Sequence, residues 1–529
     1  MPSEVQRPTS TALENNLDTR LGKAVADRAL AATTRNDSAF ALVGSAELAF
    51  TSRMTLIKAA EKTLDLQYYA IHADDTTDRM FEALRDAAGR GVRVRILLDD
   101  FNTAGKDAQV LKLAFEKNIE MRLFNPLPSN RASALWRIVS SLSDAARLQR
   151  RMHNKIFVAD NAVAITGGRN LGDTYFGQSE GVNFVDIDVL AAGRIARDLS
   201  RSFDQYWNNP LAYPVQSLMT AKDIDALKPK PATSAPVSGE NSPPIAAPIS
   251  PPSEMANRTT VTRVAVGPAG QTTTIAALPD TTNLRMLSWT WAASTMLVDK
   301  PSKIAEDADA TEESNNTTVD GLLSLMARAQ TDLLVVSPYF VPGPEMMKQF
   351  ADIRRRGVRV RVLTNSLASN DAVAAHAGYA RYREALIAMG VEMYEMRSEQ
   401  RGTVASFGSG SGSAGGSSGA SRASLHAKAV VVDNRLLDVG SMNLDLRSKL
   451  QNSEVAIVIR NRKLSAEATA LIEPGLTNGA YRVELKNGQL VWRAPIGSGL
   501  PDATSEPDAS LGLKLMVRMI APFAPDEML

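Results

Sequence analysis

The chain has 529 residues, of which 44% are hydrophobic, and this is enough to bury sizeable cores and excludes a wholly disordered protein. Its 59 basic and 58 acidic residues leave a net charge of +1, which disfavours a broadly basic nucleic-acid-binding protein. Cysteine is absent, which excludes disulfide scaffolds, zinc ribbons and cysteine nucleophiles, and the four histidines are His72, His153, His376 and His426.

The first half starts with an N-terminal extension, residues 1–40, in which no secretory signal peptide is recognisable. Hydrophobic patterning then predicts a strand at 63–71, an amphipathic helix at 78–90 and a strand at 90–97. This order favours a parallel βαβ unit. We expect a first domain over residues 41–225.

The first domain contains a cluster of polar residues at fixed spacing. His153-Asn154-Lys155 is followed by four residues, Asp160, six residues and Gly167-Gly168-Arg169-Asn170. Alternation along a strand would place His153 and Lys155 on the same side. The glycines allow a ligand to approach the backbone closely. The preceding segment, 130–151, is either ordinary packing or an apolar lid.

The second half repeats this order after a linker. Residues 226–262, rich in proline, serine and alanine, predict a semi-extended linker, and a second domain is expected over 263–462. RGVRVRVL at 356–363 repeats RGVRVRIL at 90–97. A Gly/Ser-rich loop, 406–421, precedes the second polar cluster.

The second cluster has the same spacing as the first. It contains His426-Ala427-Lys428, Asp433 and Gly440-Ser441-Met442-Asn443. A C-terminal tail, 463–529, follows and is expected to pack on the second domain. Within it, Asn487-Gly488 predicts a type I′ turn in a hairpin at 481–494.

Two such clusters facing each other suit a phosphodiester. The lysines and asparagines would bind the nonbridging oxygens and stabilise the charge of a pentacoordinate phosphorus. One imidazole would attack phosphorus, and the other would protonate the leaving alkoxide and then deprotonate the incoming water or alcohol. Because lysine supplies the positive charge, we expect neither a metal nor another cofactor.

Both clusters resemble the paired motifs of the phospholipase D superfamily. LDLQYYAIHADDTTDRM (64–80), RRMHNKIFVADNAVAITGGRNLGDTYFG (150–177) and SLHAKAVVVDNRLLDVGSMNLDLRS (424–448) are further similar to bacterial cardiolipin synthase-type proteins of the peripheral, two-motif kind. The resemblance implies an α/β fold of two similar phospholipase D-like domains. Each would be a mostly parallel mixed sheet flanked by helices, related by a pseudo-twofold axis, with the active site at their interface.

The resemblance also implies an activity and partners. The enzyme would transfer a phosphatidyl group between phospholipids through a phosphohistidine. Its substrates would be phosphatidylglycerol and, as an alternative partner, phosphatidylethanolamine, at the surface of a bacterial membrane. No nucleic-acid partner is expected. One chain suffices for a complete site, whatever the oligomeric state.

Residue roles follow the same resemblance. His153 matches the usual nucleophile and His426 the general acid/base, although the pseudo-symmetry lets either serve. The phosphate-binding residues would be Lys155, Lys428, Asn170 and Asn443. A carboxylate is needed to fix the second nitrogen of each imidazole, and the candidates are Asp186 and Glu454. The motif residues Asp160 and Asp433 are expected to support their turns.

Five further residues are candidates for substrate contacts. They are Ser441, Gly168 at the equivalent position of the first half, His72, Tyr69 and Tyr339. For His72 a loop role, and for the tyrosines core packing, remain alternatives. His376 lies in a helical pattern and is expected to be structural.

Alternative functions remain beside the transferase. A hydrolytic phospholipase D would release phosphatidic acid with the same residues. A nuclease is disfavoured by the net charge and a non-catalytic scaffold by the two intact motifs. No apolar run is long enough to span a membrane. The apolar stretch 511–525 is either a packed terminal helix or an interfacial amphipathic segment.

Overall fold

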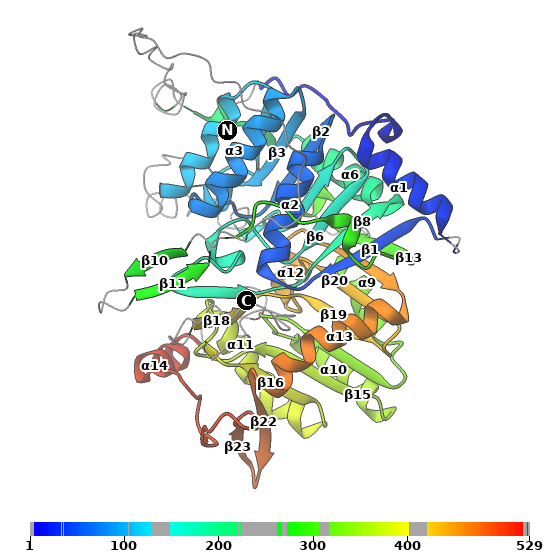
Figure 1. Ribbon diagram of the computed structural model, residues 1–529. Coiled ribbons are helices and arrows are strands. Elements are labelled where there is room, and N and C mark those ends of the chain that lie inside the picture. The colour runs from blue at the N-terminus through cyan, green and yellow to red at the C-terminus, as the bar shows by residue number, and fades with distance from the viewer. Residues whose placement is uncertain are drawn as a thin grey trace, which may run out of the picture.

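The computed structural model describes most of the chain (Figure 1). The described residues are 5–127 except 33, 35 and 104, then 149–219, 223, 262–266, 272–276, 278–305, 317–400, 421–521 and 526. Nearly all of the predicted linker at 226–262, of the lid segment at 130–151 and of the Gly/Ser-rich loop therefore lies outside the described residues.

The first half is built on a nine-stranded sheet. In spatial order its strands are β12 (Thr290–Trp291), β1 (Ser38–Val43), β8 (Asp188–Gly193), β6 (Val163–Gly167), β5 (Ile156–Ala159), β2 (Thr63–Tyr68), β3 (Arg93–Asp99), β4 (Ile119–Phe124) and β9 (Ala212–Pro214).

The second half repeats this sheet with its own nine strands. They are β13 (Ala293–Val298), β21 (Val455–Arg460), β20 (Leu436–Gly440), β19 (Ala429–Val432), β14 (Asp332–Val336), β15 (Arg359–Asn365), β16 (Glu392–Met396), β22 (Ala480–Lys486) and β23 (Gln489–Arg493). The α/β class and the internal duplication are thereby confirmed.

One detail of the predicted sheets was wrong. Parallel pairing is confined to β2–β3–β4 and β14–β15–β16, and the other neighbours in each sheet are antiparallel. The reason is local: each motif strand returns at once through a tight turn, as a β5–β6 or β19–β20 hairpin, and a short turn joins only antiparallel strands.

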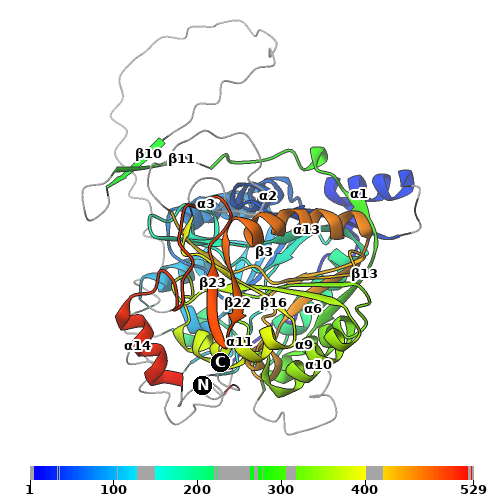
Figure 2. The same ribbon diagram turned by 90° about the horizontal axis from the view of Figure 1, so that it is seen from below.

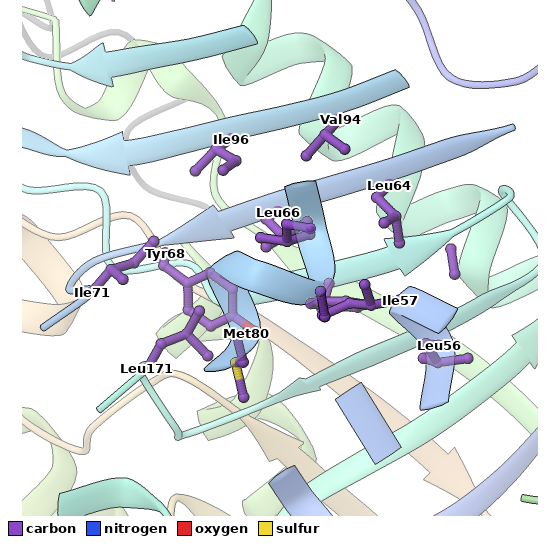
Figure 3. Packing of buried hydrophobic residues seen from close by; sticks show 14 of the residues in the cluster. Leu56, Ile57, Leu64, Leu66, Tyr68, Ile71, Met80, Val94, Ile96 and Leu171 are labelled. Carbon is purple, nitrogen blue, oxygen red and sulfur yellow. The ribbon is translucent and has the colours of Figure 1, made fainter. Parts of the chain in front are cut away.

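Helices cover the outer face of each sheet. On the first sheet these are α2 (Ala46–Ala59) and α3 (Asp75–Gly89), and on the second they are α9 (Thr318–Met326), α10 (Gly343–Arg355) and α11 (Val373–Ala388). Figure 3 shows part of the first of these cores, to which Leu64 and Leu66 of β2, Val94 and Ile96 of β3 and Ile57 of α2 belong.

A third core joins the two halves. It contains buried residues from both sheets together with α6 (Arg194–Trp207) and α13 (Arg462–Thr477). β7 (Val182–Val185) of the first half pairs in parallel with β18 (Ser421–Leu425) of the second, which also pairs with β17 (Glu399–Gln400). The halves are therefore joined by backbone hydrogen bonds as well as by apolar packing.

The tail belongs to the second half. β22 pairs with β16, and β22 and β23 form the predicted hairpin, in which Asn487 and Gly488 have φ values of 52° and 76°. These positive values at both central residues are those of a type I′ turn. The final helix, α14 (Leu511–Ile520), lies against α11 (Figure 2).

The remaining elements are short or peripheral. They are α1 (Arg20–Ala31), α7 (Val215–Leu218), α12 (Leu446–Leu450), the hairpin β10 (Thr262–Val266) and β11 (Thr272–Ala276), and the 3-10 helices η1 (Asn16–Asp18), η2 (Asp100–Asn102), η3 (Gly105–Phe115), η5 (Asp173–Tyr175), η6 (Leu284–Met286) and η7 (Pro301–Lys303). Within the described part of the chain, no helix has the length and apolar character needed to cross a bilayer.

Candidate active site

The two motif histidines lie where segments of the two halves run side by side. The amide of His153 donates to the carbonyl of Ser453 at 2.9 Å, and the amide of His426 donates to the carbonyl of Val185 at 2.8 Å. Both histidines come just before their strands β5 and β19, and not within them as the alternation argument assumed. Contacts between the halves therefore position the imidazoles.

Each imidazole takes its carboxylate from the other half. Nδ1 of His153 lies 2.9 Å from Oε2 of Glu454, and Nδ1 of His426 lies 2.7 Å from Oδ2 of Asp186. All four side chains are buried. Because a carboxylate beside Nδ1 holds the proton on that nitrogen, Nε2 of each ring is left with its lone pair.

Hydroxyl groups hold Glu454 in place. Ser441 donates to Oε2 of Glu454 at 2.5 Å, and Ser448 donates to Oε1 at 3.0 Å. The backbone N–H of Glu454 donates to Asp299 at 3.0 Å. The predicted substrate residue Ser441 is thus a partner of the carboxylate.

Asp186 is held more simply. Its Oδ1 accepts the N–H of Ile187 at 2.8 Å. Gly168, at the position equivalent to Ser441, leaves room for this carboxylate, since a Cβ on Gly168 would lie 2.4 Å from Oδ1 of Asp186. The first half therefore combines glycine with the shorter acid, whereas the second combines serine with the longer one.

The two motif lysines are buried beside the histidines. Nζ of Lys155 donates to the carbonyl of His153 at 2.7 Å, and Nζ of Lys428 donates to that of His426 at 2.5 Å. Nζ of Lys428 also lies 3.1 Å from Nδ1 of His426. Besides burial, the charges of both lysines lower the pKa of each histidine, so the two halves share one electrostatic environment.

Burial and charge set the protonation of this group. Burial lowers the pKa of His153 and His426 to about 4 each, and at His426 the charge of Lys428 adds to this effect. Burial likewise lowers the pKa of Lys155 to about 7 and that of Lys428 to about 8. At neutral pH both imidazoles are therefore uncharged.

The carboxylates remain ionised. Burial alone would raise the pKa of Glu454, but His153 and Lys155 lower it below its usual value. The hydrogen bond to His426 likewise offsets burial and lowers the pKa of Asp186. The site thus holds two carboxylates, two ammonium groups of reduced basicity and two neutral imidazoles.

The motif asparagines differ between the halves. Oδ1 of Asn170 accepts the N–H of Ala70 at 3.2 Å, and its Nδ2 donates to the hydroxyl of Tyr175 at 2.9 Å. Oδ1 of Asn443 is buried without a hydrogen-bond partner among the residues that the structure describes. Asn170 thus bonds Tyr175, whose ring lies beside His426, and the backbone N–H of Asn443 donates to Ser448, which holds Glu454.

Aromatic rings lie against each histidine. The ring of Tyr69 is 5.0 Å from that of His153, and burial raises the pKa of the Tyr69 hydroxyl to about 12. The rings of Tyr175 and Phe184 are 5.2 Å and 5.0 Å from that of His426. Of the two candidate tyrosines, Tyr69 thus contacts a motif histidine directly.

The candidates Tyr339 and His72 contact neighbours of the site residues and not the motif histidines themselves. Tyr339 donates to Asp371 at 2.8 Å, and Asp371 is one of the charges acting on Lys428. His72 is partly exposed, lies 3.0 Å from Asp107, and its ring stacks on Tyr175 at 6.2 Å. The hydrogen bond to Asp107 raises the pKa of His72.

The motif aspartates bind backbone amides. Asp160 has φ of 51° and accepts the N–H groups of residues 61–63, while Asp433 has the same φ and accepts those of residues 330–332. Each therefore fastens its turn to the start of β2 or β14, which is the supporting role expected for them. His376 is buried and lies 3.3 Å from Glu506.

Sequence reasoning missed two residues of this site. Tyr175 and Ser448 each come five positions after a motif asparagine, and each bonds a site residue, Asn170 or Glu454. The equal offset within the repeat would have pointed to both, but a tyrosine and a serine share too little chemistry to be matched by type.

Comparison with known proteins agrees with this duplicated site. A family model described as "Cardiolipin synthase, PLD-like domain" matches residues 54–207 and again residues 322–474. The chain belongs to this PLD-like family. Each match to the PLD-like model contains one complete motif, and the chain is an enzyme of the phospholipase D superfamily.

Two bacterial relatives and one solved structure extend the match. The PLD-like chain is 34% identical to Cardiolipin synthase C of Escherichia coli (strain K12), over 89% of this chain and 92% of that protein. It is 29% identical to an uncharacterised protein of Helicobacter pylori (strain ATCC 700392 / 26695), over 91% and 88%.

The crystal structure of the phosphatidylserine synthase of Haemophilus influenzae Rd KW20 is similar with a TM-score of 0.56 and 12% identity. The match covers 96% of this chain and 100% of that one. At this identity the likeness concerns the fold of the PLD-like chain alone, and it extends over both halves.

Proposed function

We propose that the protein transfers a phosphatidyl group from one phospholipid to the headgroup hydroxyl of another, as a cardiolipin synthase does, while bound peripherally at a bacterial membrane. The observation that carries the proposal is the crossed arrangement of His153–Glu454 and His426–Asp186 beside two buried lysines. The extent of identity to Cardiolipin synthase C supports it.

In the first step, Nε2 of His153 attacks phosphorus of the donor phospholipid. The new N–P bond replaces the P–O bond to the headgroup. His426 takes up a proton from water when the anionic phosphodiester binds, because the negative charge favours the imidazolium form, and gives this proton to the departing alkoxide. In later turnovers the acceptor hydroxyl supplies the proton. Lys155 and Lys428 neutralise the nonbridging oxygens as the phosphorus becomes pentacoordinate. Glu454 stabilises the positive charge that develops on His153.

In the second step, His426 removes the proton from a hydroxyl of the acceptor phospholipid. The resulting alkoxide attacks phosphorus, the N–P bond breaks and His153 returns to its neutral form. Phosphatidylglycerol as both donor and acceptor would yield cardiolipin and glycerol. Phosphatidylethanolamine as donor would release ethanolamine instead.

The decisive experiment is mass spectrometry of lipids after incubation with vesicles of phosphatidylglycerol, with and without phosphatidylethanolamine. The wild type should form cardiolipin, whereas His153→Ala and His426→Ala should form none. His376→Gln is the matched control, because His376 contacts Glu506 and no residue of the site. Normal cardiolipin formation by both alanine variants would refute the proposal.

The same lipid spectra separate transfer from hydrolysis. If water is the acceptor, phosphatidic acid accumulates in place of cardiolipin, and the protein is a hydrolytic phospholipase D. A lipid phosphate adduct on the peptide that carries His153 would support the assigned order of the histidines. An adduct on the peptide that carries His426 would reverse it.

A further inference from the structure

The last helix of the chain exposes an unusual number of large apolar side chains. Leu511, Leu515, Met516 and Met519 of α14 have between 43% and 79% of their surface exposed. With 3.6 residues per turn these positions form one continuous stripe along the helix. No residue of α14 is fully buried. The outer face of this helix is therefore apolar and has no partner in the described chain.

The helix is nevertheless fixed firmly to the protein. Its opposite face contacts α11, where Ile520 packs on the buried Val341 together with Tyr382. On the N-terminal side, Glu506 forms an ion pair with Arg383 at 2.8 Å. On the C-terminal side, Asp526 accepts a hydrogen bond from Tyr382 and forms an ion pair with Arg381, both of α11. The exposed stripe thus belongs to a helix that is anchored before and after it.

The charges of α14 are all positive. Lys514 and Arg518 lie together along one edge of the apolar stripe, and the helix contains no acidic residue. The guanidinium of Arg518 is exposed. An apolar face edged by basic residues complements an anionic lipid surface, in which acyl chains lie below negatively charged phosphates.

The position of α14 relates this face to the reaction. Ile520 packs on Val341, two residues after Tyr339, whose hydroxyl bonds Asp371 just before α11. Asp371 in turn acts on the pKa of Lys428. Helix α14 is therefore connected to Lys428 through Val341, Tyr339 and Asp371.

We propose that α14 is the membrane-docking element of this protein, which inserts Leu511, Leu515, Met516 and Met519 into the surface of an anionic bilayer and holds the site at the level of the phospholipid headgroups. The proposal rests on the proposed function, because a phospholipid substrate is the reason for docking on a membrane. The binding experiment that tests it does not depend on that function. A helix that only packs on the protein needs one apolar face, which points inward. In α14 the half-buried residues Leu513, Val517 and Ile520 form that face, and the exposed stripe is a second apolar face that points outward.

The test measures binding with an inactive protein, so that its outcome does not depend on the proposed reaction. In the His426→Ala background, flotation with vesicles that contain phosphatidylglycerol should recover the protein. The further change Leu515→Glu with Met519→Glu should reduce binding about tenfold or more, because it removes two apolar side chains from the lipid contact and adds two negative charges. Arg518→Gln should weaken binding chiefly at low salt.

The chain offers a matched control. Leu30 and Met286 are 86% and 80% exposed. Leu30 belongs to α1, which lies on the opposite side of the molecule from α14 (Figures 1 and 2), and Met286 follows Arg285, whose carbonyl accepts a hydrogen bond from Arg28 of α1. Leu30→Glu with Met286→Glu removes an equal number of exposed apolar side chains and should leave vesicle binding unchanged. Melting temperatures of both double variants should match that of the parent, since all four side chains are exposed.

A positive readout and a kinetic readout complete the test. Leu515→Trp should show fluorescence quenching by brominated lipid that the parent lacks. In the catalytically intact protein, Leu515→Glu with Met519→Glu should lose activity on vesicles but keep it on a soluble short-chain phospholipid, which separates docking from chemistry.

Unchanged flotation of the α14 variant, or equal loss in the Leu30 and Met286 control, would overturn the proposal. So would a lipid-free dimer that the α14 variant converts to a monomer, because the stripe would then be an interface between two copies of the chain.

Discussion

Nδ1 of His153 lies 2.9 Å from Oε2 of Glu454, a residue that comes 301 positions later and belongs to the other half of the molecule. Nδ1 of His426 and Asp186 repeat this relationship in the opposite direction over 240 positions. Neither half therefore contains a histidine together with the carboxylate that orients it. The duplicated motif is only half of the functional unit.

Replacing either carboxylate by its amide should impair the chemistry but not the fold. Glu454→Gln and Asp186→Asn keep the shape of the side chain and remove the charge that stabilises a charged imidazole. We expect kcat to fall about 10²- to 10⁴-fold, the range of a lost acid–base contribution. Steady-state kinetics and melting curves would check this.

The double variant Glu454→Gln with Asp186→Asn tests whether the two histidine–carboxylate pairs serve one reaction. Each carboxylate acts on a different histidine of one reaction, so their effects should be coupled and not simply multiply. Near wild-type kcat in both single variants would contradict the assigned positioning role.

Alanine at two equivalent positions should have unequal effects. Gly168→Ala places a Cβ 2.4 Å from Oδ1 of Asp186, and this buried carboxylate must then move away from His426. Ser441→Ala adds no atom and removes one hydrogen bond to Glu454, which Ser448 also holds. Activity should fall at least tenfold more in Gly168→Ala than in Ser441→Ala, as kinetics on a soluble substrate would show.

Combination with Asp186→Asn identifies the route of the Gly168 effect. If Gly168→Ala acts through Asp186, it should cost little further activity once Asp186 is already changed. Equal effects of the two alanine substitutions would show that the space beside Gly168 is not what positions this carboxylate.

The lysines predict the alkaline side of the pH profile. Because the pKa values of Lys155 and Lys428 are lowered to about 7 and about 8, their ammonium groups lose protons as pH rises through that range. We expect kcat/KM on a soluble phospholipid to decline above pH 7–8. A bound phosphate anion favours the charged lysines, so the decline of kcat should begin at higher pH.

Re-assay at pH 7 after exposure to pH 9 serves as the control for inactivation. A kcat/KM value that stays constant up to pH 9 would contradict the lowered pKa values. On the acid side, kcat/KM should decline near pH 4, where His153 becomes protonated in the free enzyme and loses the lone pair that attacks phosphorus.

Asp438, a buried acid away from the histidines, should make the free energy of unfolding depend on pH. Asp438 of β20 lies between Val430 and Val458, and burial raises its pKa from 3.8 to about 7. The unfolded chain ionises Asp438 well below the pH at which the folded chain does. The free energy of unfolding must therefore fall as pH rises between these two values.

Asp438→Asn should remove this dependence and stabilise the protein at pH 8 by up to about 4 kcal/mol. The gain in melting temperature should be much smaller at pH 4, because this pH is close to the ordinary aspartate pKa of 3.8, so that ionisation in the unfolded chain favours unfolding only slightly. Ile165, at the equivalent position of the first half, shows that this place in the sheet accepts a residue without charge. A melting temperature that falls equally at both pH values would contradict the prediction.

The repeat allowed much of the site to be predicted from the sequence. Equal spacing identified His153 and His426, and the match between the segments around Asp186 and Glu454 identified both carboxylates as candidates. Their crossed pairing did not follow, because local patterns carry no information on how two halves dock. That docking depends on a core shared by α6, α13 and both sheets.

The prediction of mostly parallel sheets failed for a related reason. The repeated βαβ pattern indicates the parallel strands correctly, but hydrophobic strand patterns do not tell which neighbour a strand chooses. The turn at Asp160 sends β5 straight back as β6, and the turn at Asp433 does the same for β19. Positive φ values at these aspartates are a property of the folded turn that spacing alone did not reveal.

The parallel contact of Met152 with Ser453 has a consequence for the protein during its synthesis. When the first half has left the ribosome, His153 is already present, but the chain that supplies Glu454 has not been made. In the proposed mechanism His153 then lacks the carboxylate that orients it, so we expect a nascent or truncated chain to be far less reactive towards lipid than the full chain. The proposed site is complete only after Glu454 has been translated and the segments around Met152 and Ser453 have come together.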